Sequence, residues 1–122
     1  MGLWYSRPLF FVADVERALA FYVGSLCFAE NWTFKEDGKV FVAQVNREDC
    51  EIILSSQWPE KNGNARLFIS LTPADYAALP GELAARGVSA KQGWWGYRTL
   101  IVTDPDGNEL YFPDPDDPGG GG

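Results

Sequence analysis

Runs of apolar residues alternate with polar segments in an order that repeats once along the chain. Residues 9–13 are a short run of bulky apolar side chains, as expected of a strand buried on both faces. Asp14 is a suitable helix N-cap, and apolar residues recur at helical spacing from Val15 onward, which predicts a helix ending near Gly24. Three strands are predicted next, at residues 28–35, 40–45 and 51–56. The first half is therefore predicted to have the order β-α-β-β-β.

The same order restarts after a polar, turn-rich segment at residues 58–64. Residues 66–71 predict a strand, and Thr72-Pro73 predicts the start of a helix. Pro80-Gly81 interrupts the helical pattern, so we expect two short helical pieces there. The remaining strands are predicted at residues 88–92, 97–103 and 109–113. Because Arg66 stands 59 positions after Arg7 in the same place of the pattern, an internal duplication is the simplest explanation.

These elements predict one α+β domain built from two tandem βαβββ modules. The modules are residues 1–57 and 65–113, joined by a linker at 58–64, and the acidic, glycine-rich residues 114–122 are expected to form a disordered tail. The 122 residues suffice for one such domain, and 46% hydrophobic with 22% charged residues is ordinary for a globular protein.

Composition excludes several functions. The chain has no histidine, which removes the commonest transition-metal sites and all His-dependent catalytic triads. Its formal net charge of −7 disfavours nucleic acid as a partner, while a cationic small molecule is compatible with it. No apolar run approaches the roughly 20 residues that cross a membrane, and no secretion signal is recognised, so a cytoplasmic location with reduced cysteines is expected.

Two segments carry a resemblance to a known family. They are "VADVERALAFYVGSLCF" at residues 12–28 and "DPDGNELYF" at residues 104–112, and both lie within the predicted pair of modules. Together they resemble the vicinal oxygen chelate superfamily, which includes glyoxalases, extradiol dioxygenases, fosfomycin-modifying enzymes and bleomycin resistance proteins. The resemblance covers about residues 7 to 113 and implies the glyoxalase/bleomycin resistance fold, a curved mixed sheet around a cavity.

In metal-dependent members of that superfamily, the resemblance implies a divalent ion held by His and Glu side chains. The corresponding positions in this sequence are Arg7, Arg66 and Tyr111. Arginine stays protonated and offers only hydrogen-bond donors, so this set is unsuited to a cation. We therefore expect no metal, no other cofactor and no catalytic residues.

The metal-free bleomycin resistance proteins are then the branch that this chain resembles most. That resemblance implies a homodimer that sequesters a cationic, aromatic drug, with a tryptophan ahead of the penultimate strand as a stacking wall. Trp95 is the candidate, with Trp94 as the adjacent possibility, because an indole can stack on flat rings or attract a cation. The alternative is that one of the two packs in the core and the other at a dimer interface.

Further candidate binding residues lie on other strands. Trp32 and Phe34 alternate with Thr33 and should share one face, where they line a cavity or simply fill the core. The positions of Arg7, Arg66, Arg98 and Tyr111 make them candidates as well. Arginines in a cavity would favour a carboxylate or phosphate ligand, unless Glu51 or Glu109 serves as a structural counterion.

The sequence thus predicts a metal-independent, dimeric small-molecule binding protein that confers resistance by sequestration. One rival is a lyase or dioxygenase of the same superfamily with relocated carboxylate ligands. Another is a scaffold module whose cavity is filled by its own side chains, with Trp94 and Trp95 packed inward.

Overall fold

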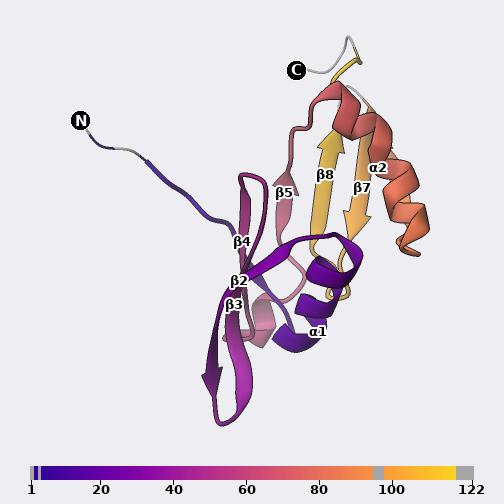
Figure 1. Cartoon of the computed structure of the whole chain (residues 1–122). Coiled ribbons are helices and arrows are strands. Elements are labelled where there is room, and N and C mark those ends of the chain that lie inside the picture. Colours follow the sequence, from indigo (N-terminus) through magenta and orange to yellow (C-terminus); the bar gives the residue numbers. More distant parts are fainter. Residues whose placement is uncertain (1, 3, 95–97, 118–122) are drawn as a thin grey trace.

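The fold consists of two modules with the same order of elements, as a computed structural model shows (Figure 1). The structure describes residue 2 and residues 4–94 and 98–117. The first module contains β1 (Leu9–Phe11), α1 (Val15–Leu19), the π-helical turn η1 (Ala20–Ser25), β2 (Ala29–Glu36), β3 (Lys39–Arg47) and β4 (Cys50–Ser55). After the short 3-10 helix η2 (Pro59–Lys61), the second contains β5 (Arg66–Phe68), α2 (Pro73–Ala85), β6 (Ala90–Trp94), β7 (Arg98–Thr103) and β8 (Glu109–Pro113).

Within the described residues, the strands form two four-stranded mixed sheets of matching topology. Their orders are β1-β4-β3-β2 and β5-β8-β7-β6. In each sheet the first strand pairs in parallel with the last strand of its module, and the other pairs are antiparallel. The predicted α+β fold of two βαβββ modules is thereby confirmed.

For the two helices, the predicted cap at Asp14 is found in the structure and the predicted break at Pro80 is not. Asp14 caps α1, since its carboxylate accepts a hydrogen bond of 2.9 Å from the backbone N–H of Glu16. The predicted break at Pro80 is wrong, because α2 runs unbroken from Pro73 to Ala85. Proline removes only the bond to the carbonyl of residue 76. Leu79 and Leu83, on either side of it, are both buried and hold the helix against the core.

One hydrophobic core joins the two modules. Strand alternation sends one set of side chains from each sheet toward the helices and the other set to the opposite face. We call these the helix side and the open face. The helix-side residues of both sheets, among them Leu54, Val102 and Phe112, belong to a single buried cluster together with Val15 of α1 and Leu83 of α2. The modules are thus fused through their helix sides, which leaves both open faces outside the shared core.

A buried carboxylate anchors the turn before β8 to the first module. Asp104 is 5% exposed and accepts hydrogen bonds from the backbone N–H groups of Asp106 (2.8 Å) and Asn108 (2.9 Å). Its second oxygen accepts from the side-chain amide of Asn108 (3.0 Å) and from the hydroxyl of Tyr22 (2.9 Å) in η1. Burial and the adjacent Asp104 carboxylate raise the pKa of Tyr22 far above its usual range, so Tyr22 remains a donor.

The rest of this turn contacts the chain after β1 and the linker. Asp106 accepts from the backbone N–H of Ala13 (2.9 Å) and pairs with Arg17 (2.9 Å). Asn108 accepts from the N–H of Ala65 (3.0 Å) and donates to the carbonyl of Phe11 (3.2 Å). Gly63 in the linker, with φ of +77°, lies so close to the turn that an added Cβ would stand 2.2 Å from the Asp106 carbonyl oxygen. The DPDG segment therefore fixes three separate parts of the chain to one another.

Residues 114–117 also belong to the folded chain. Arg98 forms ion pairs with Asp114 (3.1 Å) and Asp117 (3.6 Å), and its carbonyl accepts a backbone hydrogen bond from Asp114. The last five residues of the predicted tail, 118–122, lie outside the described residues. In the part of the chain that the structure describes, no helix is long and apolar enough to cross a membrane.

We predict that Asp104→Ala lowers the free energy of unfolding by about 2–4 kcal/mol, because it leaves the buried Tyr22 hydroxyl and the buried backbone N–H of Asn108 without their acceptor. Urea denaturation measures this change. A cycle with Tyr22→Phe should show a coupling of about 1–3 kcal/mol, while the exposed Asp116→Ala should cost less than about 0.5 kcal/mol. Equal costs for Asp104→Ala and Asp116→Ala would contradict the anchoring role.

Candidate functional site

The open face of the first sheet presents aromatic side chains to solvent. The prediction that Trp32 and Phe34 share a face is confirmed, since they pair with Gln44 and Val42, which are two residues apart on β3. Trp32 is 39% and Phe34 is 53% exposed, so ordinary core filling does not describe them. Phe11 continues this face on β1, and its ring packs 5.5 Å from that of Trp58. Such a surface offers flat, apolar contact area for a ligand or a partner.

A buried glutamine organises the polar part of the same face. Gln44 is 2% exposed, and its Oε1 accepts from Arg7 Nη1 (2.8 Å) and from the indole Nε1 of Trp32 (3.0 Å). Its Nε2 donates to Glu51 Oε1 (2.7 Å) and to Asn46 Oδ1 (3.0 Å). The ring of Trp32 is consequently held in a fixed orientation, because the Gln44 side chain that accepts its hydrogen bond is itself bonded through both Oε1 and Nε2.

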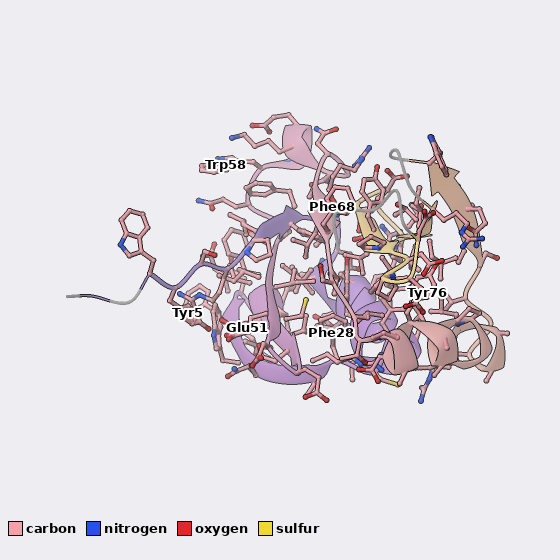
Figure 2. All side chains as sticks on the ribbon, turned by 90° about the horizontal axis from the view of Figure 1, so that it is seen from above. Tyr5, Phe28, Glu51, Trp58, Phe68 and Tyr76 are labelled. Carbon is pink, nitrogen blue, oxygen red and sulfur yellow. The ribbon has the colours of Figure 1, made fainter. Side chains whose placement is uncertain are left out.

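The N-terminal segment closes one side of this network. The hydroxyl of Tyr5 donates a hydrogen bond to Glu51, and the two side chains lie next to each other at the edge of the first module (Figure 2). This bond to a carboxylate raises the pKa of Tyr5 above its ordinary value. Arg7 lies 5.4 Å from the centre of the Tyr5 ring, in a cation–π contact.

The open face of the second sheet has its own hub, the carboxylate of Glu109. Arg66 Nε lies 2.8 Å from Oε1 of Glu109, and the Lys91 ammonium lies 3.8 Å from Oε2. The hydroxyl of Tyr111 donates to Oε1 at 2.7 Å, which raises the pKa of Tyr111. The rings of Phe68 and Tyr111 meet edge to face at 5.1 Å. Glu109 therefore acts here as the counterion that the sequence left as one of two possibilities.

The predicted binding residues do not all come together. Trp94 pairs with Arg98, and the strand alternation that places Leu100 on the helix side places these two there as well. Trp94 is 71% exposed, so it is not packed into a closed cavity as the scaffold hypothesis requires. Arg98 is engaged by Asp114 and Asp117. Trp95, the first candidate for stacking, lies outside the described residues.

Some residues of the two open faces were not anticipated. Gln44 is the hub of a network, but in the sequence it is only one polar residue in an apolar strand, and its burial, which demands hydrogen-bond partners, is not visible there. Tyr5 and Trp58 were also missed, because they lie in segments without periodicity. The signal that could identify Gln44 is a polar residue on the same face of the sheet as Trp32 and Phe34, one strand away.

Comparison with protein families agrees with the fold. The family model described as the Glyoxalase/Bleomycin resistance protein/Dioxygenase superfamily matches residues 4–112. The chain belongs to this superfamily. Among curated proteins, none matches the sequence.

Several solved structures are similar to this chain. The antibiotic-binding protein TnmS3 from Streptomyces sp. CB03234 is 26% identical, with a TM-score of 0.67 over 93% of this chain and 98% of that one. The bleomycin-binding protein of Streptomyces verticillus, complexed with copper(II)-bleomycin, is 25% identical, with a TM-score of 0.70 over 93% and 97%. The fosfomycin resistance protein FosX of Mesorhizobium loti, at 14% identity and a TM-score of 0.66 over 93% of each chain, shares the fold alone.

The residues at the superfamily's metal-ligand positions do not fit a metal ion. Arg7 is bonded to Gln44, and Arg66 with Tyr111 to Glu109, so two of the three positions carry a fixed positive charge. On the open face of the second sheet, the Glu109 carboxylate already pairs with the cations of Arg66 and Lys91. Among the described residues, no group of three or more His, Cys, Asp or Glu side chains could hold a metal ion.

We predict that Glu109→Gln lowers the pKa of Tyr111 toward the ordinary value of a tyrosine, because the phenol loses a charged acceptor that stabilises its protonated form. NMR titration with ring-labelled tyrosine measures this pKa, and Tyr111→Phe identifies the signal. Glu30→Gln, an exposed change on the first sheet, is the control and should leave the titration unaltered. An unchanged Tyr111 titration in Glu109→Gln would refute the assignment.

Proposed function

We propose that the protein binds an aromatic small molecule of the antibiotic class and sequesters it without chemical change, without a metal and in the cytoplasm. The observation that carries the proposal is the open face of the first sheet. There Trp32 and Phe34 are exposed side by side on one strand, and Trp32 is oriented by the buried Gln44. A rigid, solvent-facing indole is suited to stacking, because little conformational entropy is lost when a flat ring binds to it.

The chemistry of the second open face supports binding rather than catalysis. A metal-dependent reaction in this fold needs ligands where Arg7, Arg66 and Tyr111 stand. The two guanidinium groups cannot bind a metal ion, and the Tyr111 phenol donates to Glu109, which keeps it protonated. Tyr111 is a poor general base because its hydrogen bond to Glu109 raises its pKa. Two structural neighbours at 25–26% identity, an antibiotic-binding and a bleomycin-binding protein, are consistent with a binding function.

The proposal includes a homodimer in which open faces of two copies enclose the ligand. Both faces expose large apolar side chains, and the exposed fractions of Leu9, Phe34 and Phe68 are 42%, 53% and 46%. Exposed apolar residues gathered on one face are typical of an interface or a ligand site. The aromatics of the first sheet and the Phe68–Tyr111 pair of the second would then form opposite walls around a planar molecule.

We predict that Trp32→Ala weakens the binding of a planar aromatic antibiotic, such as bleomycin, by roughly tenfold or more, since a stacking contact contributes about 1–3 kcal/mol. Isothermal titration calorimetry across a panel of such compounds measures the affinity. Trp94→Ala is the matched control and should retain binding within about twofold, because Trp94 lies on the helix side.

Two results would contradict the proposed function. The first is a panel in which no compound binds the wild-type protein. The second is a stoichiometric transition metal found by elemental analysis after mild purification, which would favour the enzyme hypothesis with relocated ligands.

We also predict that sedimentation equilibrium of the wild-type protein gives the mass of a dimer. Phe34→Glu should shift the equilibrium toward the monomer, because it places a charge on the apolar open face. Val23→Glu is the control, since Val23 is 38% exposed but lies on η1, away from that face. A wild-type protein that is monomeric at every concentration would exclude the dimer while leaving ligand binding to be measured by calorimetry.

A further inference from the structure

A cavity lies between the two modules, apart from the proposed ligand site on the open face. Its volume is about 630 Å³, and it is bounded by the turn between β3 and β4, the segment from β5 to α2, and α2 itself. The buried residues Leu26, Phe28, Leu79, Leu83 and Phe112 form its apolar floor. Phe28 lies between the modules near the centre of the molecule (Figure 2). Trp32, Phe34 and Gln44 do not line this cavity.

Acidic side chains surround the apolar floor. Glu48 and Asp49 in the β3–β4 turn and Asp75 on α2 are exposed, which places them at the rim, and Glu51 and Glu82 are half-buried. Among the described lining residues, Arg47 is the only basic one, against five carboxylates. The potential at the rim is therefore strongly negative.

The single cation is not available to balance an incoming anion. Arg47 Nη1 lies 2.9 Å from Glu82 Oε1 and donates to the carbonyl of Leu26 at 2.9 Å. Arg47 also holds the pKa of the Glu82 carboxyl below its ordinary value, so Glu82 stays charged. With Arg47 and Glu82 paired, four carboxylates remain unbalanced around an apolar cavity.

We propose that this cavity binds a cationic amphiphile, a small molecule with an apolar body and one ammonium group. The body would occupy the floor formed by Phe28, Leu79 and Phe112, and the ammonium would remain at the rim beside Glu48, Asp49 and Asp75. This arrangement desolvates apolar surface and leaves the charge partly hydrated beside opposite charge. An anionic amphiphile of the same length would meet four unbalanced carboxylates.

The first test compares two probes with the same decyl chain, both below their micelle concentrations. Decyltrimethylammonium should bind the full chain at one site, and decyl sulfate should bind at least tenfold more weakly. Calorimetry gives the stoichiometry, and the amide signals of α2 and the β3–β4 turn should move in NMR spectra. Equal affinity for the two probes, or no binding of the cation, would overturn the proposal.

Variants with internal controls locate the site. Glu48→Gln with Asp49→Asn should weaken decyltrimethylammonium binding by roughly three- to tenfold. Glu36→Gln with Asp37→Asn, the same pair in the β2–β3 turn, should have no effect, since neither residue lines the cavity. Both turns contain a residue with positive φ, Glu48 (51°) and Asp37 (53°), so each pair of substitutions changes one residue in the left-handed region.

A steric pair completes the test. Ala78 is exposed and lines the cavity, whereas Ala74 is exposed on the same helix and does not. Ala78→Trp should abolish binding and Ala74→Trp should retain it. Normal binding of decyltrimethylammonium by Ala78→Trp would overturn the proposal. A change in the oligomeric state of the Ala78→Trp variant would overturn it as well, because the cavity would then be an interface between copies.

Independence from the proposed function is tested with Trp32→Ala. This variant should bind decyltrimethylammonium with wild-type affinity even where it loses the aromatic antibiotic. If Trp32→Ala abolishes binding of the amphiphile, the amphiphile binds at the open face and the separate cavity site is refuted. If no antibiotic binds the wild type but the amphiphile does, the proposed function fails and this inference stands.

Discussion

The buried carboxylate of Asp104 is the interaction on which the arrangement of the modules depends. A carboxylate removed from water must be surrounded by donors, and here the donors come from its own turn and from Tyr22 of the first module. The neighbouring Asp106 and Asn108 extend the same turn to the chain after β1 and to the linker. The DPDG segment is therefore more than a connection between two strands. It is the junction of the two halves of the duplicated fold.

Joining the modules through their helix sides leaves the open faces of both sheets accessible to a ligand or a partner. Both sheets bury their helix-side residues in one core, so their open faces keep exposed aromatic and apolar side chains that no element of the described chain covers. Each open face also has one central polar residue that several other polar side chains contact. On the first sheet the neutral Gln44 accepts a hydrogen bond from Trp32 and so orients its exposed indole. On the second sheet the charged Glu109 pairs with Arg66 and Lys91 and accepts from Tyr111. The two faces thus differ in kind, one aromatic and one ionic.

Much of the fold follows from the sequence because apolar periodicity and turn chemistry are local. They predict the order of the eight strands that the described residues form, the cap at Asp14 and the shared face of Trp32 and Phe34. Long-range effects were not accessible in this way. Pro80 sits inside an intact helix because buried leucines on both sides hold it. The face of Trp94 depends on the register of β6 against β7, which no local pattern specifies, and Gln44 becomes a hub only when β2, β4 and the N-terminal segment meet around it.

The arginines at the positions that correspond to metal ligands in the superfamily also bear on the charge of the proposed ligand. An arginine free in a cavity would select a carboxylate or phosphate, which the sequence left as a possibility. Arg66, however, already contacts Glu109 through Nε, and its Nη1 donates to the carbonyls of Gly63 (3.1 Å) and Ala65 (2.7 Å). An anion would have to displace these bonds and approach the negative Glu109. The ionic face therefore offers little excess positive charge, and the whole chain has a net charge of −7. For the proposed ligand, a neutral or cationic molecule is a better electrostatic match than an anion.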